Sequence, residues 1–348
     1  MTNSVLRVCE QLQQRGHEAL VIAPGVGTDC YSGARVIRTP SLPAPGYRGF
    51  RIACPWPGLR TILRQFRPDV VHLASPFVLG AHAAFAADRL EIPAVAVYQT
   101  DLAGFAARYG VGLAEPLVWR WLRRVHGHAR RTLAPSRAAV ADLTRNGVER
   151  VAHWPRGVDL VRFRPDKHDP ELQARLAPNG EVVVGYVGRL AHEKQLTLLA
   201  GLDRRADLRL VIVGDGPQMT QLRRHLPHAQ FLGFQSGENL ARTFASLDVF
   251  VHPGAHETFC QSAQEALASG VPVVGPAAGG LMDLVQPGCN GTLFEPGSIE
   301  SLHSAVLDLV HDPLRRQVYA RRARPSVSTR GWDVIGDDLV QHYQDVAS

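Results

Sequence analysis

Two glutamates eight residues apart are the side chains best suited to chemistry in this sequence. The stretch GAHETFCQSAQEALASG, residues 254–270, lies between two apolar runs and carries Glu257 before a helical pattern and Glu265 within it. A helix start offers unpaired backbone N–H groups and a partial positive charge, which suit phosphate or sugar oxygens. Glu265 falls among alanines and a leucine, so we expect it to be half-buried and to need a partner, either a ribose diol or an arginine.

Two glycine-containing turns are further candidates for an anion site. Gly188 follows an apolar run, and Arg189 and Lys194 come after it, five residues apart. Two such cations can clamp a diphosphate, although cations near a helix start are also ordinary surface residues. The turn Gly214-Asp215-Gly216-Pro217 follows the next apolar run, and Met219 stands where a GxGxxG fingerprint has its third glycine. Turn chemistry alone and a ligand role both remain open for this turn.

The elements that position these residues form an alternating pattern. Short β-branched runs alternate with helix-length amphipathic stretches in both halves of the chain, which is typical of α/β domains with parallel sheets. The predicted strands are Ala19–Ala23, Asp69–Leu73, Ala94–Tyr98, Thr132–Ala134, Val182–Val187, Leu208–Val213, Phe231–Gly233, Val249–Val251, Val273–Val274 and Thr292–Phe294. In the second half, helices are predicted over residues 193–205, 216–226, 236–246, 258–269, 297–311 and 312–323.

The length of 348 residues is enough for two domains. A stretch containing Pro and Gly near residues 154–159 marks the predicted boundary between them. We expect an N-terminal domain over residues 1–155 and a second domain over residues 156–328. Residues 329–348 should form a helix that folds back on the first domain.

Composition narrows the class of protein. The five cysteines are scattered without metal-ligand or CxxC spacing, which indicates reduced thiols in a cytosol. The N-terminus lacks a signal-peptide pattern, and no apolar run is long enough to span a membrane. Residues 1–155 carry a net charge of +9 and the rest of the chain −3. Because 36 of the 38 basic residues are Arg, this asymmetry indicates either an anionic partner or drift in composition.

Taken together, these motifs resemble those of the family 4 retaining glycosyltransferases. The chain contains an E-x7-E motif (Glu257 to Glu265), a GRL…EK element ending at Lys194, a GDGP turn ending at Pro217 and a linker similar to NGVD-F-P that begins at Arg156. Residues 69–76, 97–101 and 256–261 are most similar to those of actinobacterial GDP-mannose-dependent α-mannosyltransferases that act on lipid acceptors. The resemblance implies the GT-B fold, in which two Rossmann-like domains face each other across a cleft.

The resemblance also implies where a sugar nucleotide binds. Arg189 and Lys194 would neutralise its diphosphate in place of a metal ion, so no metal or other cofactor is expected. Glu257 would hold the sugar, and Glu265 the ribose. The residues expected to bind the donor are Gly188, Arg189, Lys194, Gly214, Asp215, Gly216, Glu257, Thr258, Phe259, Cys260, Gln261 and Glu265. The binding residues themselves do not distinguish GDP from UDP. GDP-mannose is expected as the donor because of the resemblance to the GDP-mannose-dependent enzymes.

On the acceptor side, Asp101 follows the predicted strand 94–98 and is the candidate for a contact to the transferred sugar or the acceptor, with an ordinary loop Asp as the alternative. The catalytic set is then Asp101, Arg189, Lys194 and Glu257. No general base is assigned, because in this fold the leaving phosphate takes the acceptor proton. The segment Trp119–Arg124 mixes two Trp with three Arg, which suits either an anionic membrane surface or a helix with its Trp inward and its Arg in water. No nucleic-acid partner is expected, and the expected location is the cytoplasm, peripheral at the inner face of the plasma membrane.

The chain departs from the family pattern at its start. It opens within the helix that normally follows a first, central strand and a Gly-containing loop, so we expect that strand to be absent from the N-terminal domain. A misassigned start codon would produce this arrangement. The alternatives to a hexosyltransferase are a non-catalytic nucleotide-binding remnant and a GT-B sugar-nucleotide epimerase.

Overall fold

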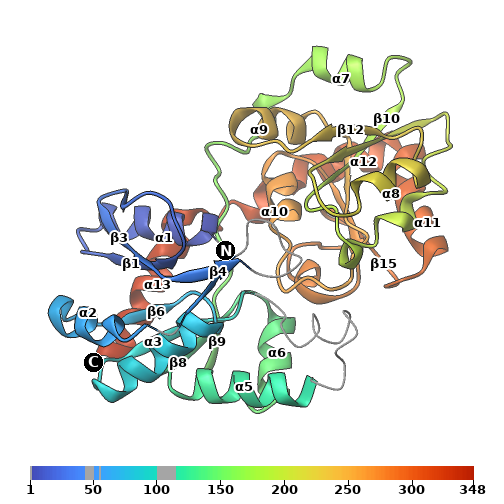
Figure 1. Cartoon of the computed structure of the whole chain (residues 1–348). Coiled ribbons are helices and arrows are strands. Elements are labelled where there is room, and N and C mark those ends of the chain that lie inside the picture. The colour runs from blue at the N-terminus through green and yellow to red at the C-terminus, as the bar shows by residue number, and fades with distance from the viewer. Residues whose placement is uncertain (1, 44–50, 55, 100–114) are drawn as a thin grey trace. The chain divides into compact units, whose positions relative to one another are not determined.

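The computed structural model describes residues 2–43, 51–54, 56–99 and 115–348, and the chain divides into two compact units (Figure 1). Unit 1 comprises Met1–Gly157 and Trp332–Ser348, and unit 2 comprises Val158–Gly331. Each unit contains parallel sheets and helices, so the predicted α/β class is confirmed. Among the described residues, no helix is both long enough and apolar enough to cross a bilayer.

Unit 2 is built on a six-stranded parallel sheet with the order β12-β11-β10-β13-β14-β15. Its strands are β10 (Val182–Val187), β11 (Leu208–Val213), β12 (Gln230–Gly233), β13 (Val249–Val251), β14 (Val273–Pro276) and β15 (Gly291–Phe294). Its α-helices are α7 (Pro170–Leu176), α8 (Met219–His225), α9 (Gly237–Ala245), α10 (Gln261–Ala268), α11 (Ile299–His311) and α12 (Pro313–Ala323). Shorter 3-10 helices are η2 (Pro165–Lys167), η3 (His192–Lys194), η4 (Leu196–Leu199), η5 (Gly279–Asp283) and η6 (Pro325–Val327).

Both faces of this sheet are covered, and the strand sequences show why. In β10, Val183 and Val187 belong to the apolar core on one face, whereas Val184 and Tyr186 belong to the core on the other. A parallel strand buried on both faces reads as a continuous apolar run rather than as an alternating one. This property made the six strands of unit 2 visible in the sequence.

Two predicted helices of unit 2 differ from the structure. The helix predicted over residues 193–205 is wrong, because the chain forms η3 and η4 instead. Gln195 separates them with a φ of 52°, in the left-handed region that an α-helix of L-residues cannot continue through. The helix predicted from Thr258 begins at Gln261, with Cys260 at its N-cap. Residues 258–260 therefore belong to a loop.

Unit 1 contains a parallel sheet with the order β6-β7-β8-β9, a three-stranded sheet β1-β3-β2 and a two-stranded pair β4-β5. The strands are β1 (Leu20–Pro24), β2 (Cys30–Tyr31), β3 (Ala34–Thr39), β4 (Ser41–Pro43), β5 (Arg51–Ala53), β6 (Val71–Leu73), β7 (Ala94–Val97), β8 (Arg131–Ala134) and β9 (Val151–His153). Strands β1, β6, β7 and β8 match predicted ones. Strand β3 was missed because Arg35 and Arg38 interrupt its apolar pattern. The absence of a first, central strand stays a prediction.

The last helix of the chain packs on unit 1. α13 (Trp332–Ala347) lies beside α1 (Thr2–Gln14), red and dark blue in Figure 1, and Nε of Arg15 donates a 2.7 Å hydrogen bond to Asp337. Nε1 of Trp154 donates to the carbonyl of Ile335 at 3.1 Å. The other helices of unit 1 are α2 (Gly58–Phe66), α3 (Val78–Arg89), α5 (Glu115–Gly127) and α6 (Arg137–Arg145).

Candidate functional site

The sheet of unit 2 reverses its direction of winding between β10 and β13, its two central strands. In doubly wound sheets, ligands bind beyond the carboxyl ends of the strands at this point, because the connections leave toward opposite faces. Gly188 follows the end of β10, and His252 follows the end of β13. The predicted residues Lys194 and Glu257 come from the loops that continue from these two strands.

The structure brings Lys194 and Glu257 into direct contact. Nζ of Lys194 donates a hydrogen bond to Oε1 of Glu257, and Nε2 of His252 lies 3.1 Å from the same oxygen. The exposed fractions of the side chains are 19% for Lys194, 15% for Glu257 and 2% for His252. One largely buried carboxylate therefore faces two groups that can carry a positive charge.

The pKa values follow from this arrangement. Burial lowers the pKa of His252, but its interactions with Cys260 and Glu257 outweigh the burial and raise the pKa above its usual range. Burial likewise raises the pKa of Glu257, whereas His252 and Lys194 outweigh it and hold the pKa below its usual range. At neutral pH the group thus contains an imidazolium, an ammonium and one carboxylate. Two cations, Lys194 and His252, thus lie at the switch point of the sheet, where they can contact an anionic ligand.

Three of these side chains are also the ones to consider for a metal ion. In the part of the chain that the structure describes, His252, Glu257 and Cys260 form the one group of His, Cys, Asp and Glu whose ligand atoms all lie within 4.8 Å of one another. A protonated imidazole has no lone pair to give a metal, and Lys194 already bonds the carboxylate. A metal ion would therefore have to displace the proton of His252 and compete with Lys194 for Glu257.

The glycines of the two predicted turns hold the neighbouring loops close together. A Cβ atom on Gly214, whose φ is 133°, would lie 1.9 Å from the carbonyl oxygen of Gly188. A Cβ atom on Gly216 would lie 2.3 Å from the carbonyl oxygen of Leu190, and the N–H of Leu190 donates to the carbonyl of Asp215 at 3.0 Å. These glycines therefore have a packing role, which fixes the backbone that carries Arg189. A direct ligand role for them stays a prediction.

The loop before α10 is fixed from behind by a pair of glycines. The N–H of Gly280 donates to the carbonyl of Glu257 at 2.8 Å, and a Cβ atom on Gly279 would lie 2.3 Å from that oxygen. Phe259 and Cys260 are buried, so this segment is anchored on both sides. The first N–H groups of an α-helix have no intrahelical acceptor, and this anchored start of α10 presents them at the site.

For the remaining predicted residues that the structure describes, it shows the position and exposure, which by themselves assign no role. Arg189 is exposed after β10, and Glu265 is half-buried within α10, as expected. Thr258 and Gln261 flank the start of α10 and are partly exposed. Asp101 lies outside the described residues. The roles of all these side chains in binding or catalysis stay predictions.

Sequence reasoning missed two side chains of the site. His252 directly follows a buried strand, a position where a polar residue signals a ligand site, but a single histidine next to an apolar run is a weak signal by itself. The side chain of Gln195 accepts from the N–H of Ala255 at 3.3 Å and so joins the loops after β10 and β13. Nothing in the sequence around Gln195 indicates that contact.

The segment Trp119–Arg124 is helical and lies within α5 of unit 1. Of the two alternatives, a helix with its Trp inward holds for one of the two Trp, and a membrane-facing surface stays a prediction for the other. Trp119 is buried, so its inclusion in a membrane-facing surface is wrong. Trp121 is 40% exposed, and Arg120, Arg123 and Arg124 are exposed. Because residues two apart lie on different sides of a helix, only one of the two Trp can face outward.

Comparisons with known proteins identify the family of the chain. A family model described as Glycosyltransferase Family 4 matches residues 1–162, and one described as Glycosyl transferases group 1 matches residues 168–325. The chain belongs to glycosyltransferase family 4. The resemblance seen in the sequence is therefore confirmed, and its family membership makes the chain a glycosyltransferase.

Two relatives cover almost the whole chain. A GDP-mannose-dependent alpha-mannosyltransferase of Corynebacterium glutamicum is 46% identical over 99% of this chain and 85% of its own length. A protein of the same name from Mycobacterium tuberculosis is 48% identical over 99% of this chain and 93% of its own length. The sulfoquinovosyl transferase SQD2 of Arabidopsis thaliana is 34% identical over 92% of this glycosyltransferase and 66% of its own length.

Solved structures confirm the predicted GT-B class. Anabaena HepE, solved with UDP and glucose, has a TM-score of 0.79 at 20% identity, covering 98% of this glycosyltransferase and 95% of that chain. The sucrose-phosphate synthase of Thermosynechococcus elongatus has a TM-score of 0.79 at 20% identity, covering 98% and 92%. At this identity the similarity concerns the fold.

Proposed function

We propose that this glycosyltransferase is an α-mannosyltransferase that takes mannose from GDP-mannose and transfers it, with retention of configuration, to a lipid or lipid-linked glycan acceptor. The relatives named for GDP-mannose are 46–48% identical, whereas SQD2, a sulfoquinovosyl transferase, is 34% identical. This difference favours the mannosyl donor over other sugar nucleotides.

The contact of Lys194 and His252 with Glu257 is the observation that carries the proposal. It lies at the switch point of the sheet, where nucleotides bind in doubly wound folds, and its two cations suit a diphosphate. Lys194 and Arg189 neutralise the charge that develops on the leaving diphosphate, so the scheme needs no metal ion. The carboxylate of Glu257 accepts hydrogen bonds from the sugar hydroxyls, and Glu265 accepts two from the ribose diol.

The transfer forms one bond and breaks one at the anomeric carbon. The acceptor hydroxyl attacks from the face on which the diphosphate leaves, the glycosidic bond to phosphate breaks, and a phosphate oxygen takes the hydroxyl proton. The products are GDP and an α-mannoside, and the step requires no protein general base. Asp101 is proposed to contact the transferred sugar or the acceptor.

The proposed location is the cytoplasm, peripheral at the inner face of the plasma membrane, because a lipid acceptor has to be met at a bilayer surface. The exposed Trp121 and the arginines beside it on α5 support this placement. Tryptophan is favoured at the interface between lipid and water, and arginine is attracted to anionic headgroups.

Calorimetric titration with GDP and with UDP tests the donor site. We expect GDP to bind the wild-type chain more tightly than UDP, and binding to weaken about tenfold or more in Glu265→Ala and in Arg189→Ala, since each loses a hydrogen bond to a charged group. Glu300→Ala and Arg204→Ala remove exposed side chains of the same types in unit 2 and should leave the affinity unchanged.

The transfer itself is tested with GDP-mannose and a lipid acceptor, with NMR of the product to read its anomeric configuration. Tighter binding of UDP would overturn the donor assignment, and a β-mannoside would overturn retention. Donor turnover without transfer would favour an epimerase. Nucleotide binding without any turnover would favour a non-catalytic protein.

A further inference from the structure

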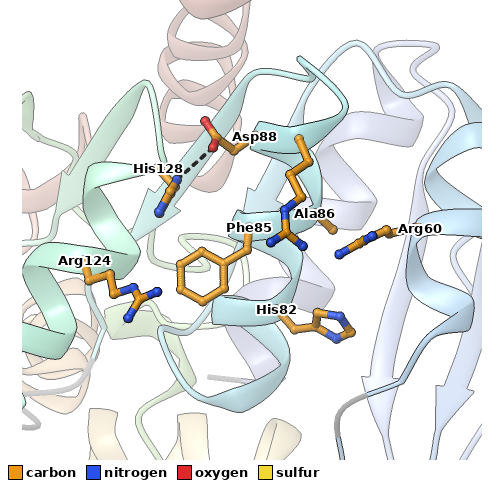
Figure 2. Close-up of a pocket in the computed structure, with 8 residues that line it drawn as sticks. Arg60, His82, Phe85, Ala86, Asp88, Arg124 and His128 are labelled. Carbon is orange, nitrogen blue, oxygen red and sulfur yellow. Dashed lines mark hydrogen bonds and ion pairs between the residues drawn. The ribbon is translucent and has the colours of Figure 1, made fainter.

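A second concentration of charged side chains lies in unit 1. A cavity of about 250 Å³ there is lined by Arg60, Arg89, Arg124, His82, His128 and Phe85. Figure 2 shows Phe85 between them, with Arg60 and His82 on one side of its ring and Arg124 and His128 on the other. These residues come from α2, α3, α5 and the turn after α5.

The positive charge in this cavity is not compensated by the protein. Among the residues that the structure describes, Arg60, Arg89 and Arg124 have no hydrogen bond or ion pair, and the guanidinium of Arg124 lies 5.5 Å from the centroid of the Phe85 ring. Asp88 is the one carboxylate that lines the cavity, and its Oδ2 atom is hydrogen-bonded to Nδ1 of His128 at 2.9 Å. Clustered guanidinium groups repel one another, and a bound anion removes that repulsion.

His82 adds a second, independent sign of a missing ligand. Its Nδ1 atom is buried and has no hydrogen-bond partner in the described part of the chain. A buried polar atom without a partner costs free energy, so native proteins usually satisfy it with a protein group, water or a ligand. An oxygen of an anion bound on the side of Phe85 where Arg60 and His82 lie would give this nitrogen a partner.

The cavity reaches the amino edge of the parallel sheet of unit 1. Arg89 is in the last turn of α3, just before β7, and Arg124 is in the last turn of α5, before β8. The end of a helix that leads into a parallel strand lies at the amino edge of the sheet. Substrates of doubly wound sheets bind at the carboxyl edge, so Arg89 and Arg124 do not belong to an acceptor subsite of that kind, whereas His82 lies nearer the start of α3.

The surface beside the cavity is apolar. Trp121 lies edge-on to Phe85, with 6.3 Å between ring centroids, and its Nε1 donates to the carbonyl of Pro76 at 3.1 Å. Trp121, Leu117 and Phe77 are 40%, 64% and 37% exposed. Leu117 is one turn from Trp121 on α5, and Phe77 follows Pro76, whose carbonyl accepts the hydrogen bond from Trp121. Exposed apolar side chains beside a cationic cavity match the layering of an anionic bilayer, where phosphates lie above acyl chains.

We propose that this cavity binds the phosphate of an anionic phospholipid headgroup and thereby seats unit 1 on the membrane. Guanidinium groups bind phosphate oxygens through paired hydrogen bonds, and Trp121 and Leu117 enter the interface beside the bound headgroup. The proposal deepens the proposed function, since it says how an enzyme with a lipid acceptor is held at the bilayer, but its chemistry does not depend on the sugar donor.

Flotation of the full chain with vesicles tests the proposal. Vesicles of phosphatidylcholine alone are compared with vesicles of equal parts phosphatidylcholine and phosphatidylglycerol. We expect binding to the anionic vesicles, with a loss of about fivefold in Arg60→Gln and in Arg124→Gln, and a larger loss in the double variant. Arg35→Gln/Arg64→Gln removes two exposed arginines of unit 1 that do not line the cavity and should retain most of the binding.

A gain-of-binding variant excludes misfolding as an explanation. Asp88→Asn removes the one lining carboxylate and should strengthen binding to anionic vesicles severalfold, whereas Asp142→Asn, an exposed change on α6, should not. Equal losses in the cavity variants and the Arg35/Arg64 control would overturn the proposal. So would protection of the cavity by glycerophosphate in solution without vesicle binding, which would indicate a soluble phosphate ligand. GDP titration of the same variants should be unchanged, so this outcome is separable from failure of the donor site.

Discussion

The buried imidazolium of His252 should make unit 2 less stable as the pH rises. Its surroundings raise the pKa of His252 from the ordinary 6.5 to about 9. The folded state thus keeps a proton that the unfolded chain releases between these two values. The stabilisation is complete below the unfolded pKa and is lost as the pH passes through the folded pKa, and a shift of this size corresponds to about 3 kcal/mol.

Hydrogen exchange with mass spectrometry can measure this effect separately in each unit. For peptides of β10 and β13, the opening free energy at pH 9 should be about 3 kcal/mol lower than at pH 6.5, after correction for the intrinsic exchange rate. His252→Gln keeps a polar side chain that does not titrate and should abolish the dependence. His225→Gln removes an exposed histidine of the same unit and should preserve it.

Two results would refute this reasoning. Opening free energies of the wild-type chain that are equal at both pH values would mean that Glu257 and Cys260 do not hold the proton on His252. A dependence that persists in His252→Gln would mean that another group of unit 2 titrates in this range. The first result would also remove the positive charge of His252 from the proposed diphosphate site.

Two further predictions concern residues away from this group. Burial lowers the pKa of His126 in unit 1 to about 4, so between pH 6.5 and 4 the unfolded chain binds a proton that the folded unit does not bind. Peptides of β8 should therefore lose protection from exchange as the pH falls from 6.5 toward 4. His126→Gln should weaken this dependence on pH. Gly214→Ala would place a Cβ atom 1.9 Å from the carbonyl oxygen of Gly188 and should lower both the melting temperature and the affinity for GDP, at a cost of about 1–3 kcal/mol. Gly180→Ala, at a φ of 78° with nothing within 4 Å, measures the conformational strain alone, and an equal effect of the two changes would contradict the packing argument.

The secondary structure could be predicted from the sequence where strands are buried on both faces. The six strands of unit 2 are apolar on both faces, so local sequence suffices to locate them. In unit 1, β3 carries Arg35 and Arg38, which interrupt its apolar pattern and hide the strand. The turn at Gln195 was hidden for another reason. Its left-handed backbone is imposed by the surrounding loops and not by the residue itself, since glutamine has no preference for that conformation.

The site was predictable in its residue types but not in its pairings. Lys194 and Glu257 were identified because a cation and a carboxylate follow buried strands. Their mutual contact joins positions 63 residues apart and depends on β10 and β13 being neighbours in the sheet, which no local pattern specifies. The charge on His252 depends on that contact in turn. A histidine after a strand is neutral by default, and only the packed group of Glu257 and Cys260 raises its pKa.

In the structure, several arginines from the first half of the chain fall into two groups, those that pair with α13 and those that line the cavity. α13 contains four aspartates and no basic residue apart from a histidine, and Arg15 and Arg131 form ion pairs with it. This helix therefore neutralises charge on the part of unit 1 that it covers. Arg60, Arg89 and Arg124 instead converge on one cavity without a partner among the described residues. Drift in genome composition would add arginines wherever water solvates them, with no reason to gather them around a buried, unsatisfied histidine nitrogen. Selection for an anionic ligand explains why three arginines converge on a cavity that has one lining carboxylate, Asp88, which contacts His128.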